Sequence, residues 1–309
     1  MIVIEYHFIR DPEKALYPGI KSLSARQFED QIEHLLKKKS LIHPEELLAY
    51  YKQHRAYPKD KFILTFDDSL KDQFTFVLPI LKKYDLNGMF FILTEPLEKR
   101  ELGSLEKARY CQYCISNDYH QFLLTYLEII NQLINIDNKF IRDYQANQRE
   151  ISQFWAEYTF YSYDERYYRF LRTNLIETEI HEKVIDQIFE DNFPDQQKLI
   201  DDHYLSWEDV ISLDKSGMVI ACHGHQHLYY SKYDYNTQYQ DIQFSKNLIE
   251  EKLRKEIKYF SYPFGDYNED SKRVLKNLDF SMSFTTSGKS EKDLYSIPRI
   301  DCSNYPTML

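Results

Sequence analysis

The stretch Phe62-Ile63-Leu64-Thr65-Phe66-Asp67-Asp68 indicates the fold most directly, because a run of apolar residues ends in two adjacent carboxylates. Such a run is typical of a buried strand whose carboxyl end opens onto a polar site. Neighbouring carboxylates repel one another unless a cation or a shared proton compensates them. An ordinary turn at the end of a strand is the alternative, since Asp favours turns.

The sequence on either side of this stretch alternates between strand and helix patterns. Residues 1–6 and 89–93 are short apolar runs, and residues 28–36 and 72–84 carry apolar side chains at helical spacing. The alternation predicts a parallel sheet with helices outside it, in which reactive residues gather at the carboxyl ends of the strands. His7 follows the first strand and falls at that end, as the Asp pair does.

A long segment interrupts the alternation. Residues 95–204 contain helix patterns at 120–143 and 175–190, a dense aromatic tract between these two patterns, and few strand patterns. The alternation resumes at residue 205. We therefore expect an α/β barrel built from residues 1–94 and 205–309, with 95–204 as a helical, aromatic-rich insertion. The insertion either serves packing and oligomerisation or forms a lid or substrate wall.

Composition excludes some classes of protein. The 309 residues carry a net charge of −10, which argues against a broad nucleic-acid surface. No stretch approaches the roughly 20 apolar residues of a membrane span. The first ten residues lack the basic region and cleavage site of a signal peptide, so we expect a cytoplasmic protein. Cys111 and Cys114 form a CxxC motif, but no second pair of cysteines or histidines lies nearby, so we do not expect a zinc ribbon.

Three histidines lie within five residues of one another after the apolar run 218–222. His223 and His227 have the i, i+4 spacing that lets two imidazoles point the same way on a helical turn and bind one cation. Asp68 would complete a set of two histidines and one carboxylate if the two strand ends are close in space. Asp67 would then stay free to act as a base.

Three motifs in this order resemble the first three motifs of the polysaccharide deacetylases, carbohydrate esterase family four with its NodB-like domain. They are LTFDD at 64–68, HGHQH at 223–227 and YPFGDY at 262–267. The resemblance covers residues 1–94 and 205–301 but not the insertion. It implies a distorted (β/α) barrel of about seven strands, one divalent metal ion, usually zinc, and hydrolysis of an N-acetyl group on an amino sugar.

The resemblance also implies roles for individual residues. Asp68, His223 and His227 are expected to hold the metal, and Asp67 is expected to be the general base. The backbone N–H of Phe264 is expected to help hold the oxyanion.

Two positions outside the metal set depart from the family. Ser69 stands where the family usually has glycine, and Ser261 stands where many members have an arginine that orients the base. Arg299 is a candidate to orient Asp67 or to bind substrate, with a structural salt bridge as an equal alternative. Tyr262 and Pro263 are further candidates for substrate contact.

The general acid is the least determined part of the site. The family often uses a histidine in a late Leu-x-His motif, yet no histidine follows His227. His7 is the expected substitute, and a hydrogen-bonded structural histidine is the alternative for it. His225 could help instead, although we expect it to face away from the metal.

These observations predict a zinc-dependent carbohydrate N-deacetylase that acts on an N-acetylated carbohydrate, with no nucleic-acid partner and no membrane span. A cytoplasmic location favours a nucleotide-linked or lipid-linked sugar precursor of surface polysaccharide over a mature polymer. The alternatives are an amidase that acts on a non-sugar amide and a catalytically inactive glycan-binding protein, which the missing late histidine suggests. The sequence leaves the oligomeric state open.

Overall fold

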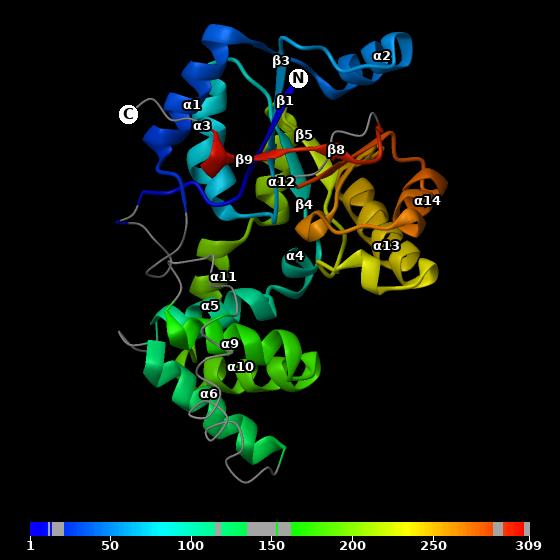
Figure 1. Cartoon of the computed structure of the whole chain (residues 1–309). Coiled ribbons are helices and arrows are strands. Elements are labelled where there is room, and N and C mark those ends of the chain that lie inside the picture. Colours follow the sequence, from blue (N-terminus) through cyan, green and yellow to red (C-terminus); the bar gives the residue numbers. More distant parts are fainter. Residues whose placement is uncertain are drawn as a thin grey trace. The chain divides into compact units, whose positions relative to one another are not determined.

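Figure 1 shows the computed structural model, which describes residues 1–11, 13, 22–114, 119–134, 153, 162–286 and 293–305. The chain divides into two compact units. The first spans Met1–Ala15, Lys21–Glu101 and Gln197–Leu309, and the second contains Leu102–Gln196. The expected insertion, 95–204, extends a few residues beyond the second unit at each end, and its assignment as a domain stays a prediction.

The first unit is built on a parallel sheet. Its strands follow the order β8-β7-β6-β5-β4-β3-β1-β9, and β2 pairs with β3 beside this path. The strands are β1 (Ile2–Tyr6), β2 (Ser40–Leu41), β3 (Lys61–Phe66), β4 (Met89–Ile92), β5 (Val219–Cys222), β6 (Tyr259–Ser261), β7 (Met282–Thr285), β8 (Ile297–Pro298) and β9 (Ile300–Asp301).

The two ends of this path meet at a single residue. β8 pairs with β7, β9 pairs with β1, and only Arg299 separates β8 from β9 in the sequence (Figure 1). The sheet is thereby nearly closed into a barrel, because one short segment contributes a strand to each edge. The expected distorted (β/α) barrel is confirmed, with eight strands along the path instead of about seven.

Helices cover the outer face of the barrel. Ser24 and Ser206 begin two of them with capping boxes, in which the cap and the third helical residue exchange side-chain to backbone hydrogen bonds. The α-helices of this unit are α1 (Ala25–Lys38), α2 (Pro44–His54), α3 (Leu78–Lys83), α4 (Glu95–Lys99), α11 (Gln197–His203), α12 (Trp207–Lys215), α13 (Tyr235–Leu253) and α14 (Glu269–Asn277). Short helical turns of other types are η2 (Gln73–Val77), η3 (Tyr230–Lys232), η4 (Pro263–Gly265) and η5 (Cys302–Asn304).

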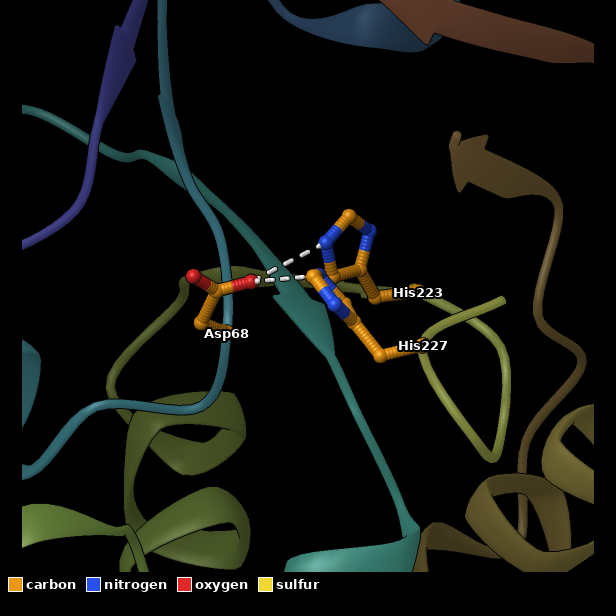
Figure 2. Close-up of side chains that lie close together, drawn as sticks. All are labelled: Asp68, His223 and His227. Carbon is orange, nitrogen blue, oxygen red and sulfur yellow. Dashed lines mark ion pairs between the residues drawn. The ribbon is translucent and has the colours of Figure 1, made fainter. Parts of the chain in front are cut away.

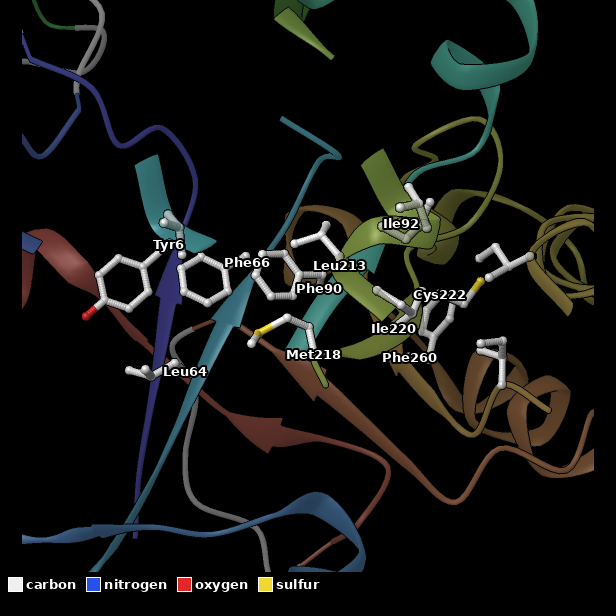
Figure 3. Close-up of a cluster of buried hydrophobic side chains, with 14 of the residues drawn as sticks. Tyr6, Leu64, Phe66, Phe90, Ile92, Leu213, Met218, Ile220, Cys222 and Phe260 are labelled. Atoms are coloured by element: carbon white, nitrogen blue, oxygen red, sulfur yellow. The ribbon is translucent and has the colours of Figure 1, made fainter. Parts of the chain in front are cut away.

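Alternate residues of β1, β3, β4, β5 and β6 face two different apolar clusters. Figure 3 shows the cluster between strands and helices, where Tyr6, Phe66 and Phe90 stack in a row. Buried residues of α1, α3, α12, α13 and α14 join this outer cluster. The opposite, inner face carries a second cluster that includes Val3 and Ile63. These strands are thus buried on both faces, against helices outside and against other strands inside the barrel.

The inner face changes from apolar to polar along the strands. Side chains two residues apart share a face, so the inner positions that follow the apolar cluster are Glu5, Thr65, His223 and Ser261, which are all buried. The carboxyl end of the barrel interior is therefore lined by polar side chains, and Asp67 continues the same register beyond β3.

The second unit is helical in its described residues. Its helices α5 (Ser104–Cys114), α6 (Tyr119–Leu133), α9 (Tyr163–Asn174) and α10 (Thr178–Asn192) pack on one another around buried aromatic side chains, among them Tyr126 and Tyr168. The expected helix at 120–143 corresponds to α6 as far as Leu133, and most of the remainder lies outside the described residues, as does most of the aromatic tract. The helix expected at 175–190 is α10.

No helix in the described part of the chain combines the length and the apolar character needed to cross a bilayer.

Candidate active site

The backbone turns sharply where β3 ends. Asp68 and Ser69 both have left-handed backbone conformations, with φ of 69° and 55°. Asp adopts this conformation more readily than most residues, whereas Ser normally avoids it. The buried Ser69 hydroxyl accepts a hydrogen bond from Leu93 N–H at 2.8 Å and donates to the Leu93 carbonyl at 3.2 Å. These bonds to the segment after β4 hold the turn that aims Asp68 at the site.

The three histidines after β5 lie in a loop and not on the expected helical turn. Gly224 has φ of 80° and His227 has φ of 55°, so neither backbone is compatible with a right-handed helix. A Cβ on Gly224 would lie 2.3 Å from the hydroxyl oxygen of Tyr230. Asp241 of α13 fixes the loop by accepting hydrogen bonds from His225 N–H, Gln226 N–H and the Tyr230 hydroxyl.

The loop and the turn bring one carboxylate and two imidazoles together. Asp68 Oδ1 lies 3.2 Å from Nε2 of His223 and 3.2 Å from Nε2 of His227 (Figure 2). His223 Nδ1 lies 2.8 Å from the Ser261 carbonyl, to which it donates, so Nε2 is the nitrogen that carries the lone pair when the ring is neutral. The predicted convergence of the two strand ends is therefore present in the fold.

These three side chains fit a bound cation. Their ligand atoms all lie within 4.8 Å of one another, and Asp68 Oδ1 is buried without a hydrogen bond among the described residues. Burial opposes ionisation of Asp68, but His223 and His227 hold its pKa well below the ordinary value. An ionised oxygen and two imidazole nitrogens are the donors that a catalytic divalent metal takes from a protein, and the hydrogen bond of His223 to the Ser261 carbonyl orients one of these rings.

Asp67 is buried beside this group and belongs to a different network. Arg299 donates from Nη1 to Oδ1 at 2.8 Å and from Nη2 to Oδ2 at 2.7 Å, and the Ser261 hydroxyl donates to Oδ2 at 3.1 Å. Burial works against the charge, but Arg299 and then His223 hold the pKa of Asp67 below its ordinary value. Asp67 Oδ2 lies 3.8 Å from His223 Nε2. An ionised carboxylate is thus kept next to the group of Asp68, His223 and His227, which could hold a cation.

The sequence also matches the model of a known protein family. The family model described as polysaccharide deacetylase matches residues 54–116 and 160–283, which together make up more than half of the chain. The chain belongs to the polysaccharide deacetylase family. The matched residues include Asp67, Asp68, His223 and His227, whereas His7 and Arg299 lie outside them. Membership supports hydrolytic deacetylation of a carbohydrate.

Solved structures with the same fold include proteins described as deacetylases. The Streptococcus pyogenes deacetylase PplD, in complex with acetate, is 16% identical with a TM-score of 0.58, and the match covers 97% of this chain and 91% of that one. IcaB from Ammonifex degensii is 15% identical with a TM-score of 0.56, covering 98% and 91%. The BpsB deacetylase domain from Bordetella bronchiseptica is 14% identical with a TM-score of 0.53, covering 97% and 94%. No protein with a curated description matches the sequence.

In this polysaccharide deacetylase family member the arginine partner of Asp67 is Arg299. Ser261 on β6 stands where many members have the arginine, and its hydroxyl still reaches Asp67. The guanidinium comes instead from Arg299, at the junction of β8 and β9, and it is only 2% exposed. Of the expected roles for Arg299, the observed contacts are those of a residue that holds Asp67.

His7 lies at the rim of the site. Its side chain is 37% exposed, and Nε2 lies 3.7 Å from Asp68 Oδ2 and 3.8 Å from Glu5 Oε1. His225 faces elsewhere, because its Nδ1 lies 2.9 Å from the Thr94 hydroxyl and its ring contacts Phe244. His7 is thus the exposed histidine beside Asp68, and its role as acid stays a prediction.

The third motif places one aromatic side chain at the rim. Phe264 in η4 has φ of 58°, is 40% exposed, and stacks on Tyr229 with ring centroids 3.8 Å apart. Its ring also meets that of His227 at 4.4 Å. Tyr262 and Pro263 are buried, and the Tyr262 hydroxyl donates to the Tyr295 carbonyl. The substrate contacts predicted for Tyr262, Pro263 and Arg299 therefore involve buried side chains, and they stay predictions.

Sequence reasoning missed Glu5. This residue is 4% exposed, and its Oε1 accepts from Arg299 Nη2 at 3.1 Å. One signal was available, since an acidic residue inside the apolar strand 2–6 shares the face of Val3 and His7. A carboxylate at such a position is rarely buried without a partner.

Proposed function

We propose that this chain is a metal-dependent hydrolase that removes N-acetyl groups from an amino sugar in a polysaccharide or its precursor. The observation that carries the proposal is the convergence of Asp68, His223 and His227 beside a separate, ionised Asp67. The arrangement divides two tasks between adjacent carboxylates, since one is a cation ligand and the other is a base.

Zinc is the proposed cation, because two imidazole nitrogens and one carboxylate leave open positions of the kind found in catalytic zinc sites. A divalent cation bound there would polarise the carbonyl of the acetamide group. Asp68, His223 and His227 would hold it, with His223 fixed by its hydrogen bond to the Ser261 carbonyl.

The remaining chemistry falls to the side chains around this group. Asp67 would take a proton from the attacking water, and Arg299 would keep the carboxylate charged and oriented for that transfer. The backbone N–H of Phe264 would stabilise the oxyanion of the tetrahedral intermediate. His7 would protonate the departing amine, because it is exposed at the rim beside Asp68.

A screen for acetate release tests the function. The purified protein, loaded with Zn²⁺ and its metal content measured, would be incubated with N-acetylated nucleotide-sugars and oligosaccharides. We expect about one divalent ion per chain and acetate release from at least one acetylated amino sugar. Bound metal without acetate release from any of them would favour the inactive glycan-binding protein or an amidase acting on another amide.

We further propose that the substrate is a nucleotide-linked or lipid-linked precursor of a surface polysaccharide and that the protein acts in the cytoplasm. Membership of the polysaccharide deacetylase family supports a carbohydrate substrate. Fractionation of cells that express the native protein tests the proposed location, and recovery outside the cytoplasm would contradict it.

A further inference from the structure

Every N–H group of the Arg299 guanidinium has an acceptor. Nε donates to the Thr285 carbonyl at 3.3 Å, Nη1 to Thr65 Oγ1 and Asp67 Oδ1, and Nη2 to Asp67 Oδ2 and Glu5 Oε1. An arginine has five N–H donors, so none is left over. The acceptors come from three parts of the barrel: β1, β7, and β3 with the turn that follows it.

Glu5 is the acceptor that electrostatics alone does not explain. Asp67 already neutralises the charge of Arg299, and burying another carboxylate costs free energy that its pairing only partly repays. Burial raises the pKa of Glu5, although Arg299 opposes this effect. Backbone register places Glu5 opposite Thr65 on β3 and Asp301 on β9, so it sits beside the place where the barrel closes.

The position of Glu5 fixes the plane of the guanidinium. Nη2 is shared between Glu5 Oε1 at 3.1 Å and Asp67 Oδ2 at 2.7 Å. Without Glu5, one N–H of a side chain that is 2% exposed would be buried without a partner. The guanidinium would turn toward another acceptor, and Asp67 would move with it, because both of its oxygens are bound to the same group.

We propose that Glu5 is a positioning residue for Asp67 that acts through Arg299. The inference rests on the proposed function, because it assigns Asp67 the role of base. It adds Glu5 to the residues that act at the site, although this β1 residue lies outside the part of the chain that matches the family model.

A double-mutant cycle tests the route of action. Glu5→Met keeps the volume of the side chain but removes the acceptor. We expect it to lower kcat by roughly 10- to 100-fold, as loss of outer-shell partners does, with KM and metal content unchanged. In an Arg299→Met background the same substitution should lower kcat no further, because the partner it acts through is absent.

Matched variants separate positioning from general damage. Glu5→Gln retains an acceptor oxygen and should keep most of the activity. Glu29→Met makes the same chemical change on α1, where Glu29 bonds Lys83 and Tyr84 away from the site, and it should leave kcat unchanged. If Glu5→Met does not fold, Glu5→Asp draws the carboxylate away from Nη2 and should lower kcat; unchanged kcat would overturn the proposal.

The outcomes distinguish the two proposals. Full activity of Glu5→Met would overturn the role of Glu5, and equal losses in both backgrounds would show that Glu5 acts through another group such as His7. Loss of metal from Glu5→Met would also overturn the route through Asp67. An inactive parent protein would defeat the proposed function instead. Crystal structures then decide the role of Glu5, since a displaced Asp67 in Glu5→Met supports it and an unmoved Asp67 contradicts it.

Discussion

The guanidinium of Arg299 binds both carboxylate oxygens of Asp67, with Nη1 2.8 Å from Oδ1 and Nη2 2.7 Å from Oδ2. A paired arrangement of this kind fixes the orientation of the carboxylate as well as its charge. Because Arg299 sits between β8 and β9, the residue that joins the two edges of the barrel also holds the proposed base.

The first prediction concerns Arg299→Lys. An ammonium group keeps the charge but cannot bind both oxygens of Asp67, so kcat for acetate release should fall roughly 10- to 100-fold with the metal retained. Steady-state kinetics and metal analysis check this. Arg273→Lys, which alters an exposed pair with Asp270 on α14, is the control and should leave kcat unchanged. Wild-type kcat in Arg299→Lys would show that paired binding is not needed.

The second prediction compares the same change at adjacent residues. Asp68→Asn should weaken metal binding by about 10-fold or more, because the ligand loses its charge. Asp67→Asn should retain the metal and lose roughly 10²- to 10⁴-fold in kcat, because a base is removed. Metal titration and acetate assays on both variants check this. Equal metal affinities in the two variants would contradict the division of labour between the carboxylates.

The third prediction concerns His7 as proton donor. His7→Gln should lower kcat for an acetamide substrate by roughly 10²- to 10⁴-fold, since an amine leaves only after protonation. Hydrolysis of 4-nitrophenyl acetate should be nearly unaffected, because a nitrophenolate leaves without a proton. His54→Gln, at an exposed residue on α2, is the control for both substrates. Parallel losses on the amide and the ester would argue for a structural His7.

The fourth prediction concerns the turn after β3. Ser69→Ala removes both hydrogen bonds to Leu93 and keeps the left-handed backbone, so it should lower the free energy of unfolding by about 1–3 kcal/mol. Ser69→Gly loses the same bonds but relieves about 1 kcal/mol of backbone strain, and it should be the more stable of the two. Urea unfolding of both variants measures the order. A less stable glycine variant would contradict this account.

The fifth prediction concerns His181 in the second unit. Its Nδ1 lies 2.8 Å from the Tyr126 hydroxyl, and burial, followed by the charge of Arg172, lowers its pKa from 6.5 to about 4. Between these values the unfolded chain binds a proton that the folded chain does not. The resulting stabilisation is therefore complete above pH 6.5 and is lost as the pH falls toward 4.

Urea unfolding between pH 6.5 and 4 measures this loss. The contribution of His181 to the slope should reach about 1.4 kcal/mol per pH unit, and His181→Gln should remove it. His54→Gln is the control, and it should retain the slope that His181 causes. An NMR titration of the His181 ring with a midpoint near its ordinary pKa would contradict the prediction.

The sequence anticipated the parts of the site that adjoin one another along the chain. The apolar run before Asp67 and the histidine spacing at 223–227 predicted two strand ends, and parallel strands bring such ends to one edge. The helical turn predicted for the histidines at 223–227 was wrong. The left-handed backbone of Gly224 depends on Asp241 and Tyr230, which lie farther along the chain.

Local patterns therefore determined the α/β alternation, the Asp67-Asp68 doublet and the candidate metal group, since each follows from apolar periodicity or short spacing within one segment. Only the tertiary structure decided that Arg299 forms hydrogen bonds with Asp67 and that Glu5 forms one with Arg299. The contact between Arg299 and Asp67 joins residues that are 232 positions apart in the sequence, and the contact between Arg299 and Glu5 joins residues that are 294 positions apart. No local pattern encodes them, because they exist only when β9 closes the barrel against β1 and places three buried charges within hydrogen-bond distance.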